Sequence, residues 1–136
     1  MTTLKTARAE RHAPAIVLRL VIVALTMATA AIHAGLGGLL FTLNAFSYAT
    51  LGIAMVLPGP VARVRWLVRV ALLGFTAATI AGWILVGARF PLAYLDKAIE
   101  VVLIVFLAFE LWLDGGPAGV VRRVRLATAI ILGRTR

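Results

Sequence analysis

Four long apolar runs separated by short polar connections dominate the chain. They cover about residues 15–34, 39–57, 66–88 and 90–113. A helix needs about 20 mostly apolar residues to cross the roughly 30 Å hydrocarbon core of a bilayer, and each run is close to that length. The pattern therefore predicts an all-α fold, a transmembrane four-helix bundle. We expect the whole chain, 1–136, to form this single membrane domain.

The connections contain residues that end helices. Glycines within 35–38 predict a tight, uncharged turn into the second run. The Pro-Gly-Pro sequence at 58–60 stops the second helix, because proline lacks the N–H and clashes with the preceding turn. Pro91 suits the first turn of the fourth helix, and the Asp-Gly-Gly-Pro sequence at 114–117 ends that helix.

The C-terminal segment, residues 117–136, is too short and too charged to cross a membrane. As a helix it places on one side Val121, Val124, Thr128 and Ile131. The other sides then carry most of Arg122, Arg123 and Arg125. This pattern predicts a short amphipathic helix in the headgroup plane, with the three arginines in contact with anionic headgroups. A loosely ordered basic anchor is the alternative.

Composition supports a membrane location. Hydrophobic residues make up 62% of the chain, and the mean hydropathy is +1.04. The formal net charge of +9 comes from cations that flank the apolar runs, so we expect lipid headgroups as partners and no nucleic acid. With no cysteine and two histidines, the chain lacks thiolate chemistry and a multi-histidine metal site of its own. We expect no metal and no cofactor.

The basic residues predict the orientation. All lysines and arginines except Arg89 and Lys97 lie in the N-terminal arm, the second connection or the tail, counting Arg19 and Arg69 with the segments they adjoin. Four spans put these segments on one side, so both termini should be cytoplasmic in an inner (cell) membrane. One alternative is a signal peptide cleaved after Ala-Thr-Ala at 28–30, which would leave three spans.

Ionisable and polar residues gather in the outer half of the predicted bundle. They are His33, Asn44, Tyr48, Asp96, Lys97 and Glu100. Charged groups inside a span are costly and usually face the protein interior or a watery cavity. We expect these residues to form either an interhelical hydrogen-bond clamp or an outer-facing site for a small ligand, a headgroup or a proton. Glu110, near the inner interface, is expected to be solvated.

Small residues recur at four-residue spacing in the third run, at Gly74, Ala78 and Gly82. Such a groove allows close helix packing in membranes. The predicted contact is either within the chain or between copies of it.

The sequence contains no catalytic signature, such as a nucleophile elbow, a phosphate-binding glycine loop or a His-Glu-x-x-His zinc motif. We therefore expect a protein that is not an enzyme, either an accessory subunit of a membrane complex or a small self-associating bundle. The alternative is a small proton- or cation-coupled transporter or channel that uses Glu100 and Asp96. A membrane enzyme or cofactor binder using His33 is a third hypothesis.

Three segments resemble a group of small prokaryotic four-span membrane proteins with no assigned activity. The segments are IHAGL at 32–36, LNAFSY at 43–48 and PLAYLDKAIE at 91–100, and the similarity covers about residues 15–113. The resemblance implies a four-helix membrane fold. It directs attention to His33, Asn44, Asp96, Lys97 and Glu100, and it implies no activity.

Overall fold

The computed structural model describes the backbone of residues 2–131 and the side chains of residues 14–131. Within that range the chain is helical apart from short connections. The helices are α1 (Thr2–Leu36), α2 (Leu39–Val56), α3 (Pro60–Arg63), α4 (Arg65–Val86), α5 (Pro91–Leu113) and α6 (Gly116–Ile131). Residues 132–136 of the predicted tail lie outside the described residues.

The helix ends follow the expected signals, with one difference. The second, third and fourth apolar runs become α2, α4 and α5, and each connection contains the glycine or proline that predicted it. The first helix, however, begins at Thr2 and contains Pro14 within it. The residues before Pro14 include several good helix formers, so the helix is not confined to the apolar run.

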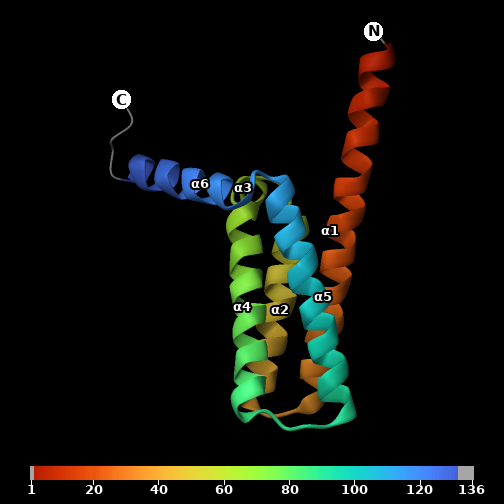
Figure 1. Ribbon diagram of the computed structural model, residues 1–136, viewed down its shortest axis with the longest axis vertical. Coiled ribbons are helices and arrows are strands. Elements are labelled where there is room, and N and C mark those ends of the chain that lie inside the picture. Colours follow the sequence, from red (N-terminus) through yellow and green to blue (C-terminus); the bar gives the residue numbers. More distant parts are fainter. Residues whose placement is uncertain (1, 132–136) are drawn as a thin grey trace.

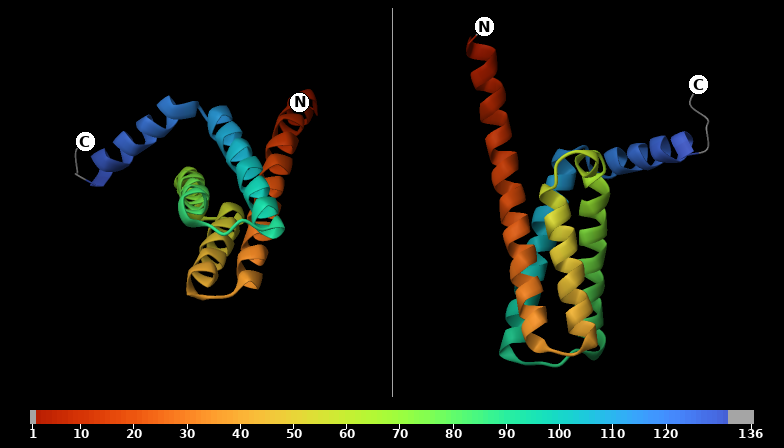
Figure 2. Two further views of the ribbon diagram at one scale, coloured as in Figure 1. Left: turned by 60° about the horizontal axis from the view of Figure 1, so that its bottom comes forward. Right: turned by 180° about the vertical axis from the view of Figure 1, so that it is seen from behind.

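Four long helices lie side by side in a ring. α1 packs between α2 and α5, and α4 packs against α5 and α2, as Figures 1 and 2 show. Fully buried side chains on the inner faces form the core, among them Ile22, Tyr48, Met55, Leu72, Leu103 and Leu107. The end at which residues 37–38 and 87–90 connect the helices is called the turn end here, and the opposite end is called the α6 end.

α1 and α2 lie close together at Gly52. A Cβ at this position would lie 2.4 Å from Met27 Cε and 3.1 Å from Thr26 Cγ2. A methyl group would therefore displace the flexible end of Met27 and press on Thr26, so a small residue favours the observed spacing. The predicted stripe of small residues behaves differently. Gly74, Ala78 and Gly82 are exposed, and nothing lies within 4 Å of a Cβ built on Gly74 or Gly82.

Three helical segments are long and apolar enough to cross a membrane: Pro14–Leu36, Leu39–Val56 and Arg65–Val86. α5 is 23 residues long but contains four charged residues, Asp96, Lys97, Glu100 and Glu110. All four are buried, with at most 9% of any residue exposed. The charges of α5 therefore face the other helices, and the apolar residues of α5 form most of its outer surface.

α6 leaves the bundle sideways, as Figure 1 shows. Gly115 and Gly116 make the turn with φ values of +107° and +58°, a region that favours glycine. Gly119 then packs close to the turn, since a Cβ there would lie 3.0 Å from the Asp114 carbonyl oxygen. α6 contacts the end of α5, while the large apolar side chains along its length remain exposed.

Candidate functional site: a buried ionic cluster beside a cavity

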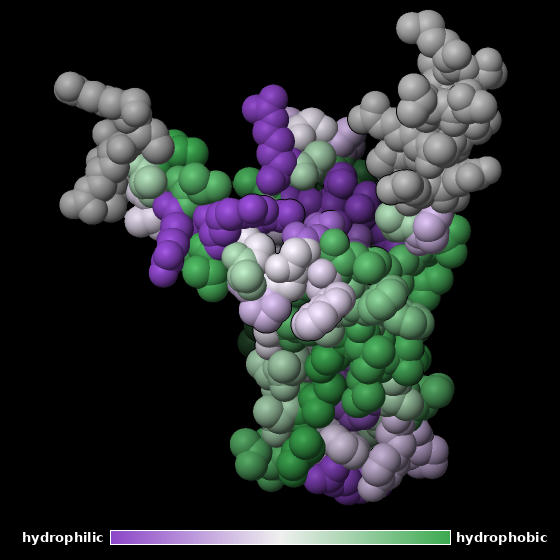
Figure 3. All heavy atoms as spheres, turned by 45° about the horizontal axis from the view of Figure 1, so that its top comes forward, coloured by the Kyte–Doolittle hydropathy of each residue, from purple (hydrophilic) through white to green (hydrophobic). Residues whose placement is uncertain are grey.

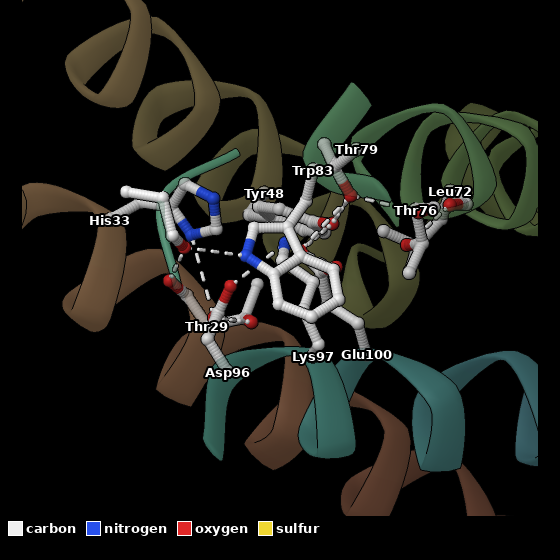
Figure 4. A network of polar contacts seen from close by, with 11 residues as sticks. Thr29, His33, Tyr48, Leu72, Thr76, Thr79, Trp83, Asp96, Lys97 and Glu100 are labelled. Atoms are coloured by element: carbon white, nitrogen blue, oxygen red, sulfur yellow. Dashed lines mark hydrogen bonds and ion pairs between the residues drawn. The ribbon is translucent and has the colours of Figure 1, made fainter. Parts of the chain in front are cut away.

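The turn end of the bundle encloses a cluster of polar side chains from all four long helices. Figure 4 shows Thr29 and His33 from α1, Tyr48 from α2, Thr79 from α4, and Asp96, Lys97 and Glu100 from α5. We call these seven residues the ionic cluster. Five of the six residues predicted from the sequence belong to it, and the sixth, Asn44, lines the adjoining cavity.

Glu100 joins three helices. Its Oε1 accepts hydrogen bonds from the Tyr48 hydroxyl at 2.8 Å and the Thr79 hydroxyl at 3.0 Å. Its Oε2 accepts one from Lys97 Nζ at 2.6 Å. The residue is fully buried, and a buried carboxylate needs such donors to offset the hydration that it has lost.

Asp96 connects α5 to α1. Thr29 donates a hydrogen bond to its Oδ1 at 2.6 Å, and Lys97 Nζ lies 3.0 Å from its Oδ2. His33 Nδ1 lies 3.6 Å from Oδ1 but only 2.9 Å from the Thr29 carbonyl oxygen. Because a carbonyl only accepts, Nδ1 must carry a proton to make that bond, which leaves Nε2 as the acceptor nitrogen of the neutral ring.

The ionic cluster contains more carboxyl groups than ammonium groups. The carboxyl groups of Asp96 and Glu100 share the single ammonium group of Lys97, and all three residues are buried. Buried charged groups are stable only when they are paired. A further positive group beside Asp96 would therefore be stabilised by this arrangement.

His33, Asp96 and Glu100 have the ligand types and spacing of a metal site, since one ligand atom from each lies within 4.8 Å of the others. Lys97 Nζ, however, contacts one oxygen of each carboxylate. The lysine ammonium therefore takes the position between the carboxylates that a metal ion would need. In this arrangement Lys97 acts as a built-in cation.

A cavity of about 410 Å³ adjoins the ionic cluster. Aromatic side chains form much of its wall, including Phe41, Phe75, Trp83 and Phe90. His33, Asn44, Asp96 and Lys97 contribute its polar side. Two members of the predicted small-residue stripe, Ala78 and Gly82, also line it, so part of the stripe forms cavity wall, with no close contact to another helix of the chain.

Trp83 is held at the cavity edge by three contacts. Its indole N–H donates to the Ala88 carbonyl at 3.0 Å, and the Arg89 guanidinium lies 4.0 Å from the ring centroid. Tyr94 meets the ring edge-on at 5.2 Å between centroids. These contacts connect the α4–α5 turn to the cavity wall.

Thr29 and Thr79 were not predicted from the sequence. Both are buried or half-buried donors to the carboxylates, and neither is charged, so neither stood out among the apolar residues of its helix. Thr29 could have been found from its position four residues before His33, which puts both side chains on one face of α1.

The expectation that Glu110 is solvated was wrong. Glu110 is 4% exposed and accepts hydrogen bonds from Arg19 at 3.3 Å and Arg69 at 2.8 Å. The arginines approach from α1 and α4 because each lies on the inner face of its helix at the depth of Glu110.

The three arginines predicted to contact headgroups differ in their surroundings. Arg123 lies 3.9 Å from Asp114 of the same chain, whereas Arg122 and Arg125 are exposed.

Comparisons with known proteins add no assignment. No protein-family model, no curated protein and no solved structure matches the chain.

Proposed function

We propose that α5 is a fourth membrane span, so that the protein crosses the inner membrane four times with both termini in the cytoplasm. A helix of 23 residues is about 34 Å long at 1.5 Å per residue. Its charged residues have partners inside the bundle, which removes the main obstacle to a membrane location. The turn end then faces outward, and the arginine-rich α6 end lies on the cytoplasmic side, in agreement with the positive-inside rule.

We further propose that the protein is a non-enzymatic binding protein whose outward-facing cavity holds a small amphiphile with a positively charged head. The observation that carries this proposal is that two carboxyl groups share one ammonium group in the ionic cluster, beside a cavity with aromatic walls. A cationic head next to Asp96 would pair with its carboxyl group, and aromatic rings stabilise cations through their faces. The aliphatic part of the ligand would lie against the apolar wall.

The ionic cluster has a structural part in this proposal. It connects all four long helices, and each carboxylate oxygen of Asp96 and Glu100 has a partner. The cluster thereby fixes the helices around the cavity. Such a rigid bundle suits an accessory subunit of a larger membrane complex or a small self-associating bundle. Purification in mild detergent from the native host would distinguish these two by the presence of a stoichiometric partner.

Trp83 provides the test of ligand binding. The chain has three tryptophans, so the Trp66→Phe/Trp112→Phe variant leaves only the one at the cavity. In nanodiscs, we expect its emission to shift saturably with an alkylammonium, and to respond weakly to the alcohol and the carboxylate of the same chain length. Asp96→Asn in this background should abolish the saturable response, whereas Asp114→Asn at the other end should keep it. An equal response to all three amphiphiles, or an unchanged response in Asp96→Asn, would refute the proposal.

A proton- or cation-coupled carrier that uses Glu100 and Asp96 is the second candidate, because the same two carboxyl groups could hold a transported cation. Glu100→Gln separates the two. A clamp around a binding cavity loses stability or assembly in this variant, whereas a carrier stays folded and loses pH-dependent flux in vesicles.

A further inference from the structure

Arginines gather at the α6 end of the bundle around two carboxylates. Arg69 contacts both Glu110 and Asp114, Arg19 contacts Glu110, and Arg123 approaches Asp114. Arg65 lies one turn before Arg69 on the same face of α4. We call Arg19, Arg65, Arg69 and Arg123 the arginine cluster.

The arginine cluster has more positive charge than its partners neutralise. Four guanidiniums face two carboxylates, which leaves an excess of two positive charges. Within residues 14–131, three atoms of this region are buried without a hydrogen-bond partner: the Nε atoms of Arg65 and Arg69, and Oε2 of Glu110. The Arg65 side chain makes a single hydrogen bond in this part of the chain, from Nη2 to the Leu57 carbonyl at 3.1 Å. Arg65 is half-buried and contacts neither carboxylate, so the excess of guanidinium groups at this end favours an anion.

α6 begins beside the arginine cluster and extends away from the bundle. Figure 3 shows hydrophilic residues gathered over this end of the molecule, next to the base of α6. Along α6, Val120, Val124 and Ile131 share one face by their spacing, and Arg122 and Arg125 lie on the opposite one. Val124 is 46% and Ile131 83% exposed. An isolated helix of 16 residues is marginally stable in water, so an apolar surface is needed to cover this face.

We propose that the arginine cluster binds the phosphate of an anionic phospholipid from the cytoplasmic leaflet, and that α6 lies on that leaflet with its valine and isoleucine face in the acyl boundary. This inference rests on the proposed orientation of the bundle. Guanidinium groups match phosphate geometry bidentately. Lipid phosphate is also the abundant anion at the depth where the spans end and α6 begins.

The test uses the full chain in nanodiscs of equal parts phosphatidylcholine and phosphatidylglycerol, followed by native mass spectrometry of the released protein. We expect wild-type protein to retain phosphatidylglycerol in preference to phosphatidylcholine. Arg65→Gln should lower that retention roughly tenfold, as expected for loss of a charge-assisted hydrogen bond. Arg89→Gln is the matched control, because it removes the same charge at the turn end and should keep the lipid.

Two results would overturn the inference. One is equal retention of phosphatidylglycerol in the two variants. The other is displacement of the lipid by millimolar inorganic phosphate, which would indicate a site for a free anion. Arg65 is chosen over Arg69 because Arg69 also holds Glu110 and Asp114 in place, so its loss could unfold the bundle.

The underlying orientation is tested separately. The chain contains no native cysteine, so Ala129→Cys creates a unique label site on α6. Labelling from outside right-side-out vesicles would contradict the orientation, and retention of lipid without such labelling supports both. The Trp83 response of the outer cavity does not depend on this outcome.

Discussion

Tyr48 on α2 and Glu100 on α5 are 52 residues apart in sequence and share a 2.8 Å hydrogen bond in the centre of the bundle. The same hydroxyl lies 2.9 Å from the Thr79 hydroxyl on α4. The Tyr48 hydroxyl therefore connects α2 to α4 through Thr79 and to α5 through the Glu100 carboxylate. We expect Tyr48→Phe to lower the free energy of unfolding by about 1–2 kcal/mol, because it removes a buried hydrogen bond to a charged group and leaves the ring in place.

The measurement is unfolding by SDS in mixed micelles, followed by far-ultraviolet circular dichroism. Tyr94→Phe is the matched control, since Tyr94 is 53% exposed and should change stability little. An equal effect of the two substitutions would show that the hydrogen bond to Glu100 contributes nothing.

Lys97→Met should turn the ionic cluster into a metal site. The substitution keeps an unbranched side chain, one atom shorter, and removes the cation that contacts Asp96 and Glu100. His33 and the two carboxylates then have the ligand set of a three-residue zinc site with an open position. We expect the variant to be destabilised without metal and restabilised by Zn²⁺, measured as a shift in thermal denaturation. Lys97→Arg keeps a cation at this position and should show no such response. If Zn²⁺ does not stabilise Lys97→Met, the interpretation of Lys97 as a built-in cation is contradicted.

Gly52 and Gly74 allow a matched test of helix packing. Gly52→Leu would place a large side chain against Met27 and Thr26, so we expect it to destabilise the bundle by about 3 kcal/mol. Gly74→Leu should leave the stability of the single chain unchanged, because a Cβ at Gly74 meets nothing within 4 Å. If copies of the chain associate through the small-residue stripe, Gly74→Leu will lower the oligomeric state in analytical ultracentrifugation without unfolding the protein.

Glu110 should contribute more to stability than Asp114. Glu110→Ala leaves Arg69 buried without one of its two carboxylates, a change that typically costs about 3–5 kcal/mol. Asp114 has 41% of its side chain exposed, so water can replace part of its contact in Asp114→Ala and the effect should stay below about 2 kcal/mol. The same SDS unfolding assay measures both, and a reversed order would contradict the described ion pairs.

Helix positions and ends were predictable from sequence to a large extent, because glycine and proline interrupt apolar runs of membrane-spanning length. The charged residues of the ionic cluster were predictable because Asp96, Lys97 and Glu100 are conspicuous within an apolar segment, whereas Thr29 and Thr79 were not. Helix rotation was harder to predict. Lipid is as apolar as a protein core, so apolar periodicity does not mark the inward face of a membrane helix.

Two differences follow from that limit. The stripe of Gly74, Ala78 and Gly82 resembled a packing groove but lies on the outside and along the cavity, while a single glycine, Gly52, makes the close contact. Glu110 was expected to be solvated because its partners, Arg19 and Arg69, are far away in sequence. The rotation of α1 and α4 about their own axes brings both arginines to Glu110.

The burial of charge on α5 also affects how the protein is made. If α5 is the fourth span proposed above, then as a separate helix it would bring Asp96, Lys97 and Glu100 into contact with acyl chains, and each charged group costs about 2.5–3.5 kcal/mol at the centre of a membrane helix. The threonines and the tyrosine that relieve this cost belong to α1, α2 and α4, which precede α5 along the chain. During synthesis, the hydrogen-bond donors of α1, α2 and α4 therefore enter the membrane before α5, the segment that needs them. A chain that lost an early span would leave its last span unable to remain in the bilayer.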